Sequence, residues 1–264
     1  MSVNYNINRR KNTDEDHIQI ASNLNEKSYI DSTADPNSYY LYSVEAEKDG
    51  TKSSSLESEV FTFNEYADSF FRMRKNITDA GTNPKTFTNN GVVINEDGGV
   101  FSGGQYITTE KSTDFQFGTS DFTIEFCITP QTLDVDAVIL DMRDLYNIPH
   151  HQRNYANCTS ISASGMWWTN GNQWLLFPYI FQLGVRYSCA ITRKNGVLMG
   201  FINGVKVGQY NDLTGMYSIS ALTIGSSFND VGHENFFSGS ITNVRTLKGV
   251  AKYTENYEIT YQDK

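Results

Sequence analysis

The sequence predicts an all-β protein built from antiparallel β-sandwiches, for three reasons. Residues 121–129, DFTIEFCIT, alternate apolar and polar side chains with the period of two that is typical of a half-buried strand. Helical periodicity is almost absent, and 133–145 is the only weak candidate for a helix. Tight hairpins are predicted at the Asn-Gly dipeptides, because both residues tolerate the positive φ of a type I′ turn. The four dipeptides are Asn90-Gly91, Asn170-Gly171, Asn195-Gly196 and Asn203-Gly204.

Two different compositions divide the 264 residues near Asn64. Residues 1–63 contain short strand-like runs, interrupted by the acidic triplet at 14–16 and the serines at 53–55. Residues 65–264 hold the tryptophans, most of the glycines and the longer strands. A chain of this length can bury one large core or two smaller ones. We therefore expect a small module at 1–63 and a larger sandwich at 65–264.

The charge balance argues against a nucleic-acid partner. Lysine and arginine number 21 against 30 acidic residues, a formal net charge of −9, whereas phosphate binding needs a concentrated basic face. No apolar segment follows the charges of the N-terminal MSVNYNINRRK, and no run of about 18 apolar residues occurs. We expect neither a signal peptide nor membrane insertion. The widely spaced Cys127, Cys158 and Cys189 predict neither a disulfide framework nor a metal knuckle, and favour folding in a reducing cytosol.

The C-terminal part of the chain contains two motifs that resemble a known family. Residues 239–245 follow the pattern G-x-(I/L)-x-x-(V/I)-R, and residues 249–254 read G-V-A-x-Y-T. They resemble the laminin-G-like, concanavalin A-like lectin/glucanase domains that occur in bacteriophage virion proteins. The resemblance covers roughly 68–262. It implies a jelly-roll sandwich in which Arg245 and Tyr253 fix the end of the chain onto the sheet rather than contact a ligand.

The N-terminal residues resemble a fibronectin type III domain that lacks its first two strands. The Y-x-I-x-R strand of that family is matched at Tyr5, Ile7 and Arg9. Its Y-x-Y-x-V-x-A strand is matched at Tyr40, Tyr42, Val44 and Ala46. The resemblance implies an incomplete β-sandwich that leaves Tyr40 and Tyr42 partly uncovered, and natural proteins seldom leave such a sheet open. We expect this module to be a docking element, covered by another copy of the chain or by a different virion protein.

An extracellular glycosidase is a distant alternative, because the sequence lacks the necessary carboxylate pair. Glucanases of this fold cleave sugars with carboxylates held close together on one strand. Asp121 and Glu125 stand too far apart for that arrangement, and the acidic residues between 134 and 144 include no glutamate. No Ser-His-Asp or Cys-His order is evident either. We expect a protein without enzymatic activity.

Calcium is the only cofactor that the sequence suggests. Relatives of this fold hold the ion at the rim of a sheet, and Ca²⁺ takes roughly six to eight oxygen ligands from irregular loops. The candidate ligands are Asp141, Asp144, Asn229, Asp230 and Glu234. The alternative interpretation is that these are ordinary loop residues, since turns favour the same side chains.

Segment 144–174 is the most informative one for ligand binding. A carbohydrate site needs exposed aromatic rings beside amide and carboxylate groups, because sugars present flat apolar faces rimmed by hydroxyls. The candidates are Trp167, Trp168, Trp174, Tyr146, Tyr155 and Asn170. Trp167 and Trp168 must point to opposite sides of a strand, so one indole is expected in the core and the other outside it. The alternative is that both are packed by strands or by neighbouring subunits.

The leading prediction for function is a non-enzymatic structural protein of a bacteriophage particle, such as a capsid decoration, collar or tail-fibre component. It depends on the family resemblance, because a fold alone does not fix a function. The expected partners are other virion proteins through 1–63, further copies of the chain, and a cell-surface glycan. The alternative is a host-surface glycan-binding adhesin. A virion location implies assembly in the host cytoplasm and action outside the cell.

Overall fold

The structure is a computed structural model that describes residues 3–11, 16–25, 29, 31, 33–34, 39–53, 57–61, 69–71, 73, 77–133, 137–143, 158–170, 173–212, 219–229 and 232–259. It divides into two compact units between Glu65 and Tyr66. Within these ranges the regular structure is β-strand except for one turn of 3₁₀ helix, Thr113–Phe115. The predicted all-β class is therefore confirmed. Among the described residues no helix has the length and apolar character needed to cross a membrane.

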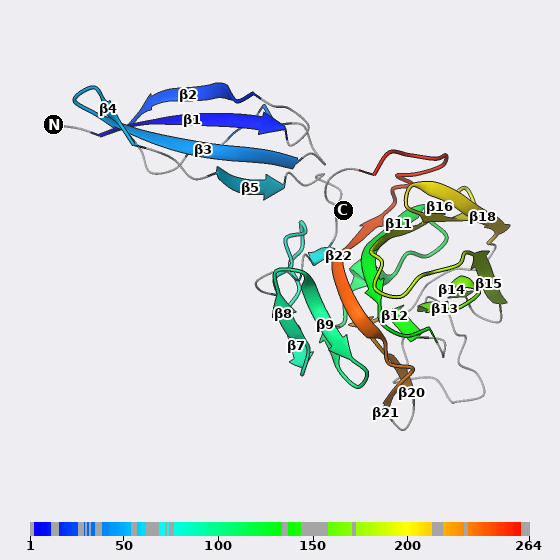
Figure 1. Ribbon diagram of the computed structural model, residues 1–264. Helices are drawn as coiled ribbons and strands as arrows, with labels where there is room; N and C mark the ends of the chain where they lie inside the picture. Colours follow the sequence, from blue (N-terminus) through cyan, green and yellow to red (C-terminus); the bar gives the residue numbers. More distant parts are fainter. Residues whose placement is uncertain are drawn as a thin grey trace. The chain divides into compact units, whose positions relative to one another are not determined.

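The N-terminal unit is one antiparallel sheet (Figure 1). Its strands are β1 (Asn4–Lys11), β2 (Ile18–Leu24), β3 (Tyr39–Lys48), β4 (Thr51–Lys52) and β5 (Glu57–Phe61). They follow the order β2-β1-β3-β4, and β5 also pairs with β3. The register sets Tyr5 opposite Ala46 and Arg9 opposite Tyr42. The described part of this unit holds a single sheet rather than the incomplete sandwich that we expected, and the fibronectin likeness stays a prediction.

A buried ion pair joins this sheet to the segment around Asp31. Arg9 Nη1 donates to Asp31 Oδ2 at 2.6 Å, and the Tyr42 hydroxyl donates to the same oxygen at 2.8 Å. The Arg9 guanidinium also lies 4.5 Å from the centre of the Tyr40 ring. Tyr40 is only 1% exposed, so the expectation that it would be partly uncovered is wrong; the guanidinium packs on its ring. Tyr42 is half-buried.

The C-terminal unit contains two large antiparallel sheets and a short two-stranded ribbon. The first sheet consists of β7 (Phe87–Asn90), β10 (Tyr106–Thr109), β12 (Ala137–Asp141), β13 (Cys158–Ser162), β14 (Gly165–Asn170), β15 (Gln173–Pro178) and β19 (Thr223–Ile224). The second consists of β6 (Ser69–Phe71), β8 (Val93–Asn95), β9 (Gly98–Ser102), β11 (Phe122–Pro130), β16 (Tyr187–Lys194), β17 (Val197–Ile202), β18 (Val205–Asn211) and β22 (Ser238–Lys248). The ribbon is β20 (Ser227–Asn229) with β21 (Gly232–Glu234).

The two large sheets share one hydrophobic core. The seven-stranded sheet has the order β15-β14-β13-β12-β19-β10-β7, and the eight-stranded sheet β18-β17-β16-β11-β22-β9-β8, with β6 also paired to β22. Core side chains come from both, including Ile107 and Trp168 from the first and Ile124 and Val244 from the second. The predicted sandwich is therefore present. The weak helix candidate at 133–145 is wrong, because its apolar run forms the buried strand β12, and a short apolar run fits either structure.

Two of the predicted hairpins are confirmed. Asn195-Gly196 joins β16 to β17 with φ values of 48° and 77°, and Asn203-Gly204 joins β17 to β18 with φ values of 49° and 75°. Positive φ at both positions is the geometry that Asn-Gly tolerates. β14 and β15 also pair, starting at Asn170, although the glycine that follows lies outside the described residues.

The hairpin predicted at Asn90-Gly91 is wrong. β7 and β8, which flank this dipeptide, belong to different sheets. The preceding Asn89 explains the difference, because its side chain accepts from Val92 N at 2.8 Å and donates to Val92 O at 2.9 Å. These bonds hold a turn that carries the chain from one sheet to the other.

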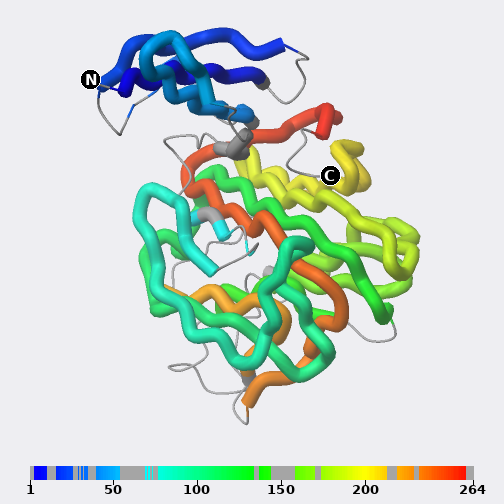
Figure 2. The backbone as a smooth tube through the Cα atoms, turned by 60° about the vertical axis from the view of Figure 1, so that its left-hand side comes forward, coloured from blue at the N-terminus to red at the C-terminus, as the bar shows by residue number. Residues whose placement is uncertain are grey.

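The closing strand β22 lies inside the eight-stranded sheet, beside β11 (orange and green in Figure 2). Arg245 on β22 forms an ion pair with Glu125 on β11, and Lys252 Nζ lies 3.2 Å from the same carboxylate. The Tyr253 hydroxyl donates to Glu125, and its ring stacks on Tyr257 with centroids 3.6 Å apart. Arg245 and Tyr253 thus attach the end of the chain to the sheet, as the resemblance implied.

A second, smaller core lies under this C-terminal segment. Ala190, Met199 and Phe201 are buried there, on β16 and β17. Tyr253 and Tyr257 pack against them from outside. The outer face of the eight-stranded sheet is therefore covered at this place by the chain's own residues.

Candidate functional site

One row of side chains crosses the outer face of the seven-stranded sheet. Strand pairing sets these residues opposite one another from β7 to β15: Thr88, Thr108, Thr223, Asp141, Cys158, Thr169 and Trp174. The neighbouring row includes Ile107, Leu140 and Trp168, which belong to the core. Because successive side chains point to opposite faces of a sheet, the first row points away from the core.

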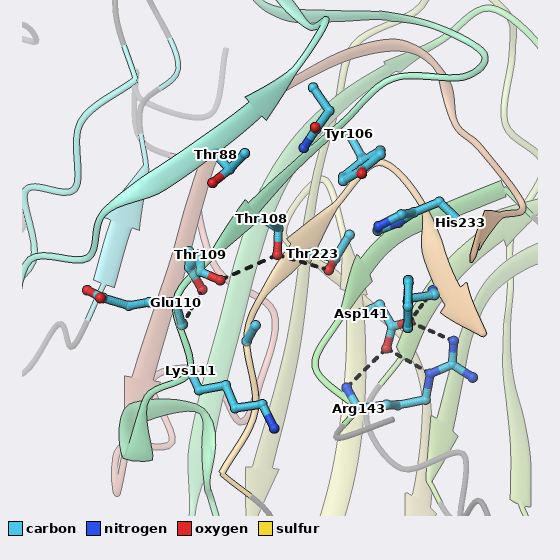
Figure 3. A pocket seen from close by; sticks show the side chains of 13 residues that line it. Thr88, Tyr106, Thr108, Thr109, Glu110, Lys111, Asp141, Arg143, Thr223 and His233 are labelled. Atoms are coloured by element: carbon cyan, nitrogen blue, oxygen red, sulfur yellow. Dashed lines mark hydrogen bonds and ion pairs between the residues drawn. The ribbon is translucent and has the colours of Figure 1, made fainter. Parts of the chain in front are cut away.

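A pocket of about 480 Å³ lies at the β7 end of this face (Figure 3). Thr88, Thr108 and Thr223 line it from three adjacent strands. The hydroxyl oxygens of Thr108 and Thr223 lie 3.4 Å apart, and either can be the donor. A hydroxyl can donate one hydrogen bond and accept two, so this lining suits a ligand that carries many hydroxyls.

An aromatic pair lines another part of the pocket. The rings of Tyr106, from β10, and His233, from β21, are stacked with centroids 3.5 Å apart at an interplanar angle of 19° (Figure 3). Phe228 meets the edge of the imidazole at 4.9 Å, and Ser226 Oγ lies 2.8 Å from His233 Nδ1. Burial lowers the pKa of His233, and the nearby Asp141 offsets this only in part. The imidazole is therefore neutral near pH 7.

A buried ion pair forms a third part of the lining. Asp141 accepts from Arg143 Nε at 2.7 Å and from Arg143 Nη2 at 2.6 Å, which is the two-point geometry of a strong pair. The backbone N–H groups of Arg143 and Phe228 also donate to this carboxylate, at 3.0 and 3.1 Å. Burial works to lower the pKa of Arg143, but the hydrogen bond and charge of Asp141 outweigh it and raise the pKa. The Arg143 guanidinium therefore stays charged, and its two-point contact with Asp141 fixes the position of both side chains in the pocket.

The three tryptophans predicted for the site have different environments. Trp168 is fully buried in the core against Phe122, whereas Trp167 is half-buried and its indole N–H donates to Ser162 Oγ at 3.0 Å. The expected opposite orientation of these two indoles is confirmed, and Trp168 is wrong as a ligand contact because it has no exposed surface. Trp174 is 55% exposed, at the β15 end of the outer row. Tyr146 and Tyr155 lie outside the described residues, as does the side chain of Asn170.

The calcium candidates are not brought together among the described residues. The part of the chain that the structure describes contains no group of three or more histidine, cysteine, aspartate or glutamate side chains suited to a metal. Asp141 is bound to Arg143, and Glu234 is exposed on the ribbon. Asp144 and Asp230, and the side chain of Asn229, lie outside the described residues, so calcium binding stays a prediction.

Sequence reasoning missed most of the pocket. Its lining comes from separate segments between positions 88 and 233, and strand register brings them together. The available signal was the alternation at 106–109, YITT, where Tyr106 and Thr108 share one face. That pattern shows an outward polar face but not which strands lie beside it.

The sequence pattern of the family described as the concanavalin A-like lectin/glucanases superfamily matches residues 101–254, more than half of the chain. The chain belongs to this superfamily. No curated protein sequence matches it.

Solved structures agree with this superfamily fold. Domain 4 of AbnA, a GH43 extracellular arabinanase from Geobacillus stearothermophilus in complex with arabinotriose, has a TM-score of 0.54 and 16% identity, covering 70% of this chain and 94% of that one. The botulinum neurotoxin serotype D binding domain has a TM-score of 0.52 and 12% identity, covering 75% of this chain and 50% of that one. A Trypanosoma rangeli sialidase mutant displaying trans-sialidase activity has a TM-score of 0.52 and 12% identity, covering 79% of this chain and 40% of that one. This superfamily member thus spans half or less of the last two chains, and the likeness is one of fold.

Proposed function

We propose that this superfamily member is a non-enzymatic, lectin-like protein that binds a glycan in the pocket on the outer face of the seven-stranded sheet. The pocket carries the proposal, because it combines a stacked aromatic pair, Tyr106 with His233, and a threonine-lined surface. Sugars require both kinds of contact, apolar faces for their C–H groups and hydrogen-bonding groups for their hydroxyls. The AbnA domain, of similar fold, is known in complex with arabinotriose, which supports the same class of ligand here.

The environment of Asp141 supports a role without catalysis. A glycosidase needs one carboxyl group that can protonate the leaving sugar and a second carboxylate close by. Asp141, the buried carboxylate of the pocket, is held by two donors of the Arg143 guanidinium and by two backbone N–H groups. A carboxylate whose two oxygens are occupied by these donors serves as a structural anchor of the pocket.

Replacing Tyr106 with alanine is expected to weaken glycan binding about 5- to 100-fold, by analogy with the loss of a stacked base from an aromatic ring. A glycan array identifies the ligand, and isothermal titration calorimetry then gives the affinity of the wild type and the variant. Tyr179→Ala is the matched control, since Tyr179 is also half-buried but does not line the pocket. Equal affinities of wild type and Tyr106→Ala, with both folded, would contradict this site.

The tryptophan end of the same face is a second candidate for the sugar contact. Trp174 lies about 14 Å from Asp141 along the outer row, three strand spacings of roughly 4.8 Å, and it is 55% exposed. Trp167 lies beside it on β14 and is half-buried. If Trp174→Ala reduces binding and Tyr106→Ala does not, the sugar binds at the tryptophans instead.

We also propose that the chain is displayed on a bacteriophage particle and that 1–63 docks it there. The location on a particle is supported by the resemblance of residues 239–245 and 249–254 to phage virion domains. Docking through 1–63 is supported by the single N-terminal sheet, on which Ile18 is 56% exposed and Val44 is 47% exposed. Small domains bury little apolar surface, so they gain from a covering partner.

A fragment of residues 1–63 is expected to be unfolded or self-associating, and a fragment of 65–264 to fold but not attach to particles. Circular dichroism, sedimentation and electron microscopy of antibody-labelled particles check these outcomes. A well-folded monomeric 1–63 fragment would argue against docking, and unlabelled particles would argue against the virion role.

A further inference from the structure

The ionisable groups around the pocket balance one another. Its described lining includes two acids, Glu110 and Asp141, two bases, Lys111 and Arg143, and His233. With the imidazole neutral, the formal charges add to zero. Glu110 and Lys111 are exposed at adjacent positions, where solvent and salt screen their charges.

The arginine of the pocket is not positioned to receive an anion. A carboxylate is bound best by two parallel N–H groups of a guanidinium. On Arg143 the Nε and Nη2 groups already donate to Asp141, at 2.7 and 2.6 Å. The two side chains are only 10% and 3% exposed, so a second carboxylate would have to compete for a buried pair.

The histidine supplies no positive charge near pH 7 either. The groups around its ring are Tyr106 on one face, Phe228 at the edge, Ser226 at Nδ1, and the charge of Asp141 nearby. Burial lowers the pKa of His233 in spite of that carboxylate. The neutral ring can exchange a hydrogen bond with a hydroxyl through its other nitrogen.

We infer that the pocket accepts an uncharged sugar unit and discriminates against an anionic one, such as a sialic or uronic acid. This inference rests on the proposed function. An anionic sugar would lose water around its carboxylate without gaining a buried cationic partner, because Arg143 is held by Asp141 and Lys111 is exposed to solvent. A buried charge without such a partner is costly. A neutral sugar presents only hydroxyls, which Thr88, Thr108, Thr223 and Asn90 of the lining can match.

The test is the affinity of the full chain for matched neutral and anionic glycans. Arabinotriose and lactose are the neutral probes, and 3′-sialyllactose is lactose with one added anionic sugar. We expect at least one neutral glycan to bind about tenfold more tightly than 3′-sialyllactose or any uronic-acid glycan on the same array, as for a buried group left without its partner. Equal or tighter binding of the anionic glycans overturns the inference and leaves glycan binding intact. Binding of no glycan overturns the proposed function and the inference with it.

A charge placed at the rim gives a second test. Thr88 is exposed and lines the pocket, so Thr88→Lys adds a cation without disturbing the core. We expect this variant to bind 3′-sialyllactose several-fold more tightly than the wild type, with Thr88→Gln as the uncharged control of similar length. If Thr88→Lys binds the anionic probe no better than Thr88→Gln, the charge explanation is wrong.

Discussion

Replacing Trp168 with alanine is expected to lower the free energy of unfolding by about 3–5 kcal/mol. The indole has no exposed surface, and its centroid lies 5.7 Å from that of Phe122 on the facing sheet. Alanine would lose the buried apolar area and leave a cavity that the two sheets can close only in part. Urea unfolding followed by circular dichroism measures the effect.

Trp174→Ala is the matched control for this experiment. It makes the same chemical change on the neighbouring strand β15, but at a side chain that is 55% exposed. We expect the free energy of unfolding to fall by no more than about 0.5 kcal/mol, since substitutions of exposed residues seldom have a larger effect. Similar losses at both positions would mean that the two indoles do not differ in burial as described.

Replacing Glu125 with glutamine is expected to lower the free energy of unfolding by about 3–5 kcal/mol, the loss that follows when one partner of a buried ion pair is removed. Glutamine keeps the volume of the side chain but removes its charge. The buried Arg245 then loses the negative charge of Glu125, and Lys252 and Tyr253 lose the carboxylate that they contact. Glu255→Gln is the control, because that carboxylate is 83% exposed in its pair with Lys206.

The same carboxylate makes stability depend on pH. Burial alone would raise the pKa of Glu125, but the charges of Arg245 and Lys252 and the hydrogen bond from Tyr253 outweigh it and lower the pKa from 4.5 to about 2. A carboxyl whose pKa is lower in the folded state stabilises the fold above its unfolded pKa and loses that contribution as the pH falls. The loss should amount to about 3 kcal/mol between pH 5 and pH 2.

Unfolding midpoints of the wild type and Glu125→Gln, measured across this range, check the pH dependence. The difference between them should shrink as the pH falls toward 2, because the wild-type carboxyl then becomes neutral too. A difference that is constant from pH 5 to pH 2 would show that the charge of Glu125 does not stabilise the fold.

Local chemistry explains which parts of the fold the sequence predicts. The turns at 195–196 and 203–204 have positive φ at both central residues, which is the geometry that the Asn-Gly dipeptide predicts. The turn at 90–91 depends instead on the side chain of Asn89 and on the separation of two sheets. The strand at 137–141 was ambiguous because periodicity cannot distinguish a short buried strand from a helix.

The candidate site was predictable only in part for a related reason. Alternation along one strand was enough to separate Trp167 from Trp168. The pocket is lined by residues from β10, β12, β19 and the ribbon. The sequence of a single strand does not reveal its register with strands that are distant in the chain. Tyr106 and His233, 127 positions apart (233 − 106), meet only in the folded chain.

The covering of the eight-stranded sheet by Tyr253 and Tyr257 has a consequence for engineering the domain. Substitutions on this covered face of the eight-stranded sheet disturb packed side chains, so we expect them to lower the yield of folded protein. On the other side, exposed positions such as Thr88 and Trp174 can be varied with little effect on the core. A library intended to change ligand choice should therefore randomise the outward positions of β7, β10 and β15. Residues 245–257 should be kept unchanged, because they pack on the eight-stranded sheet.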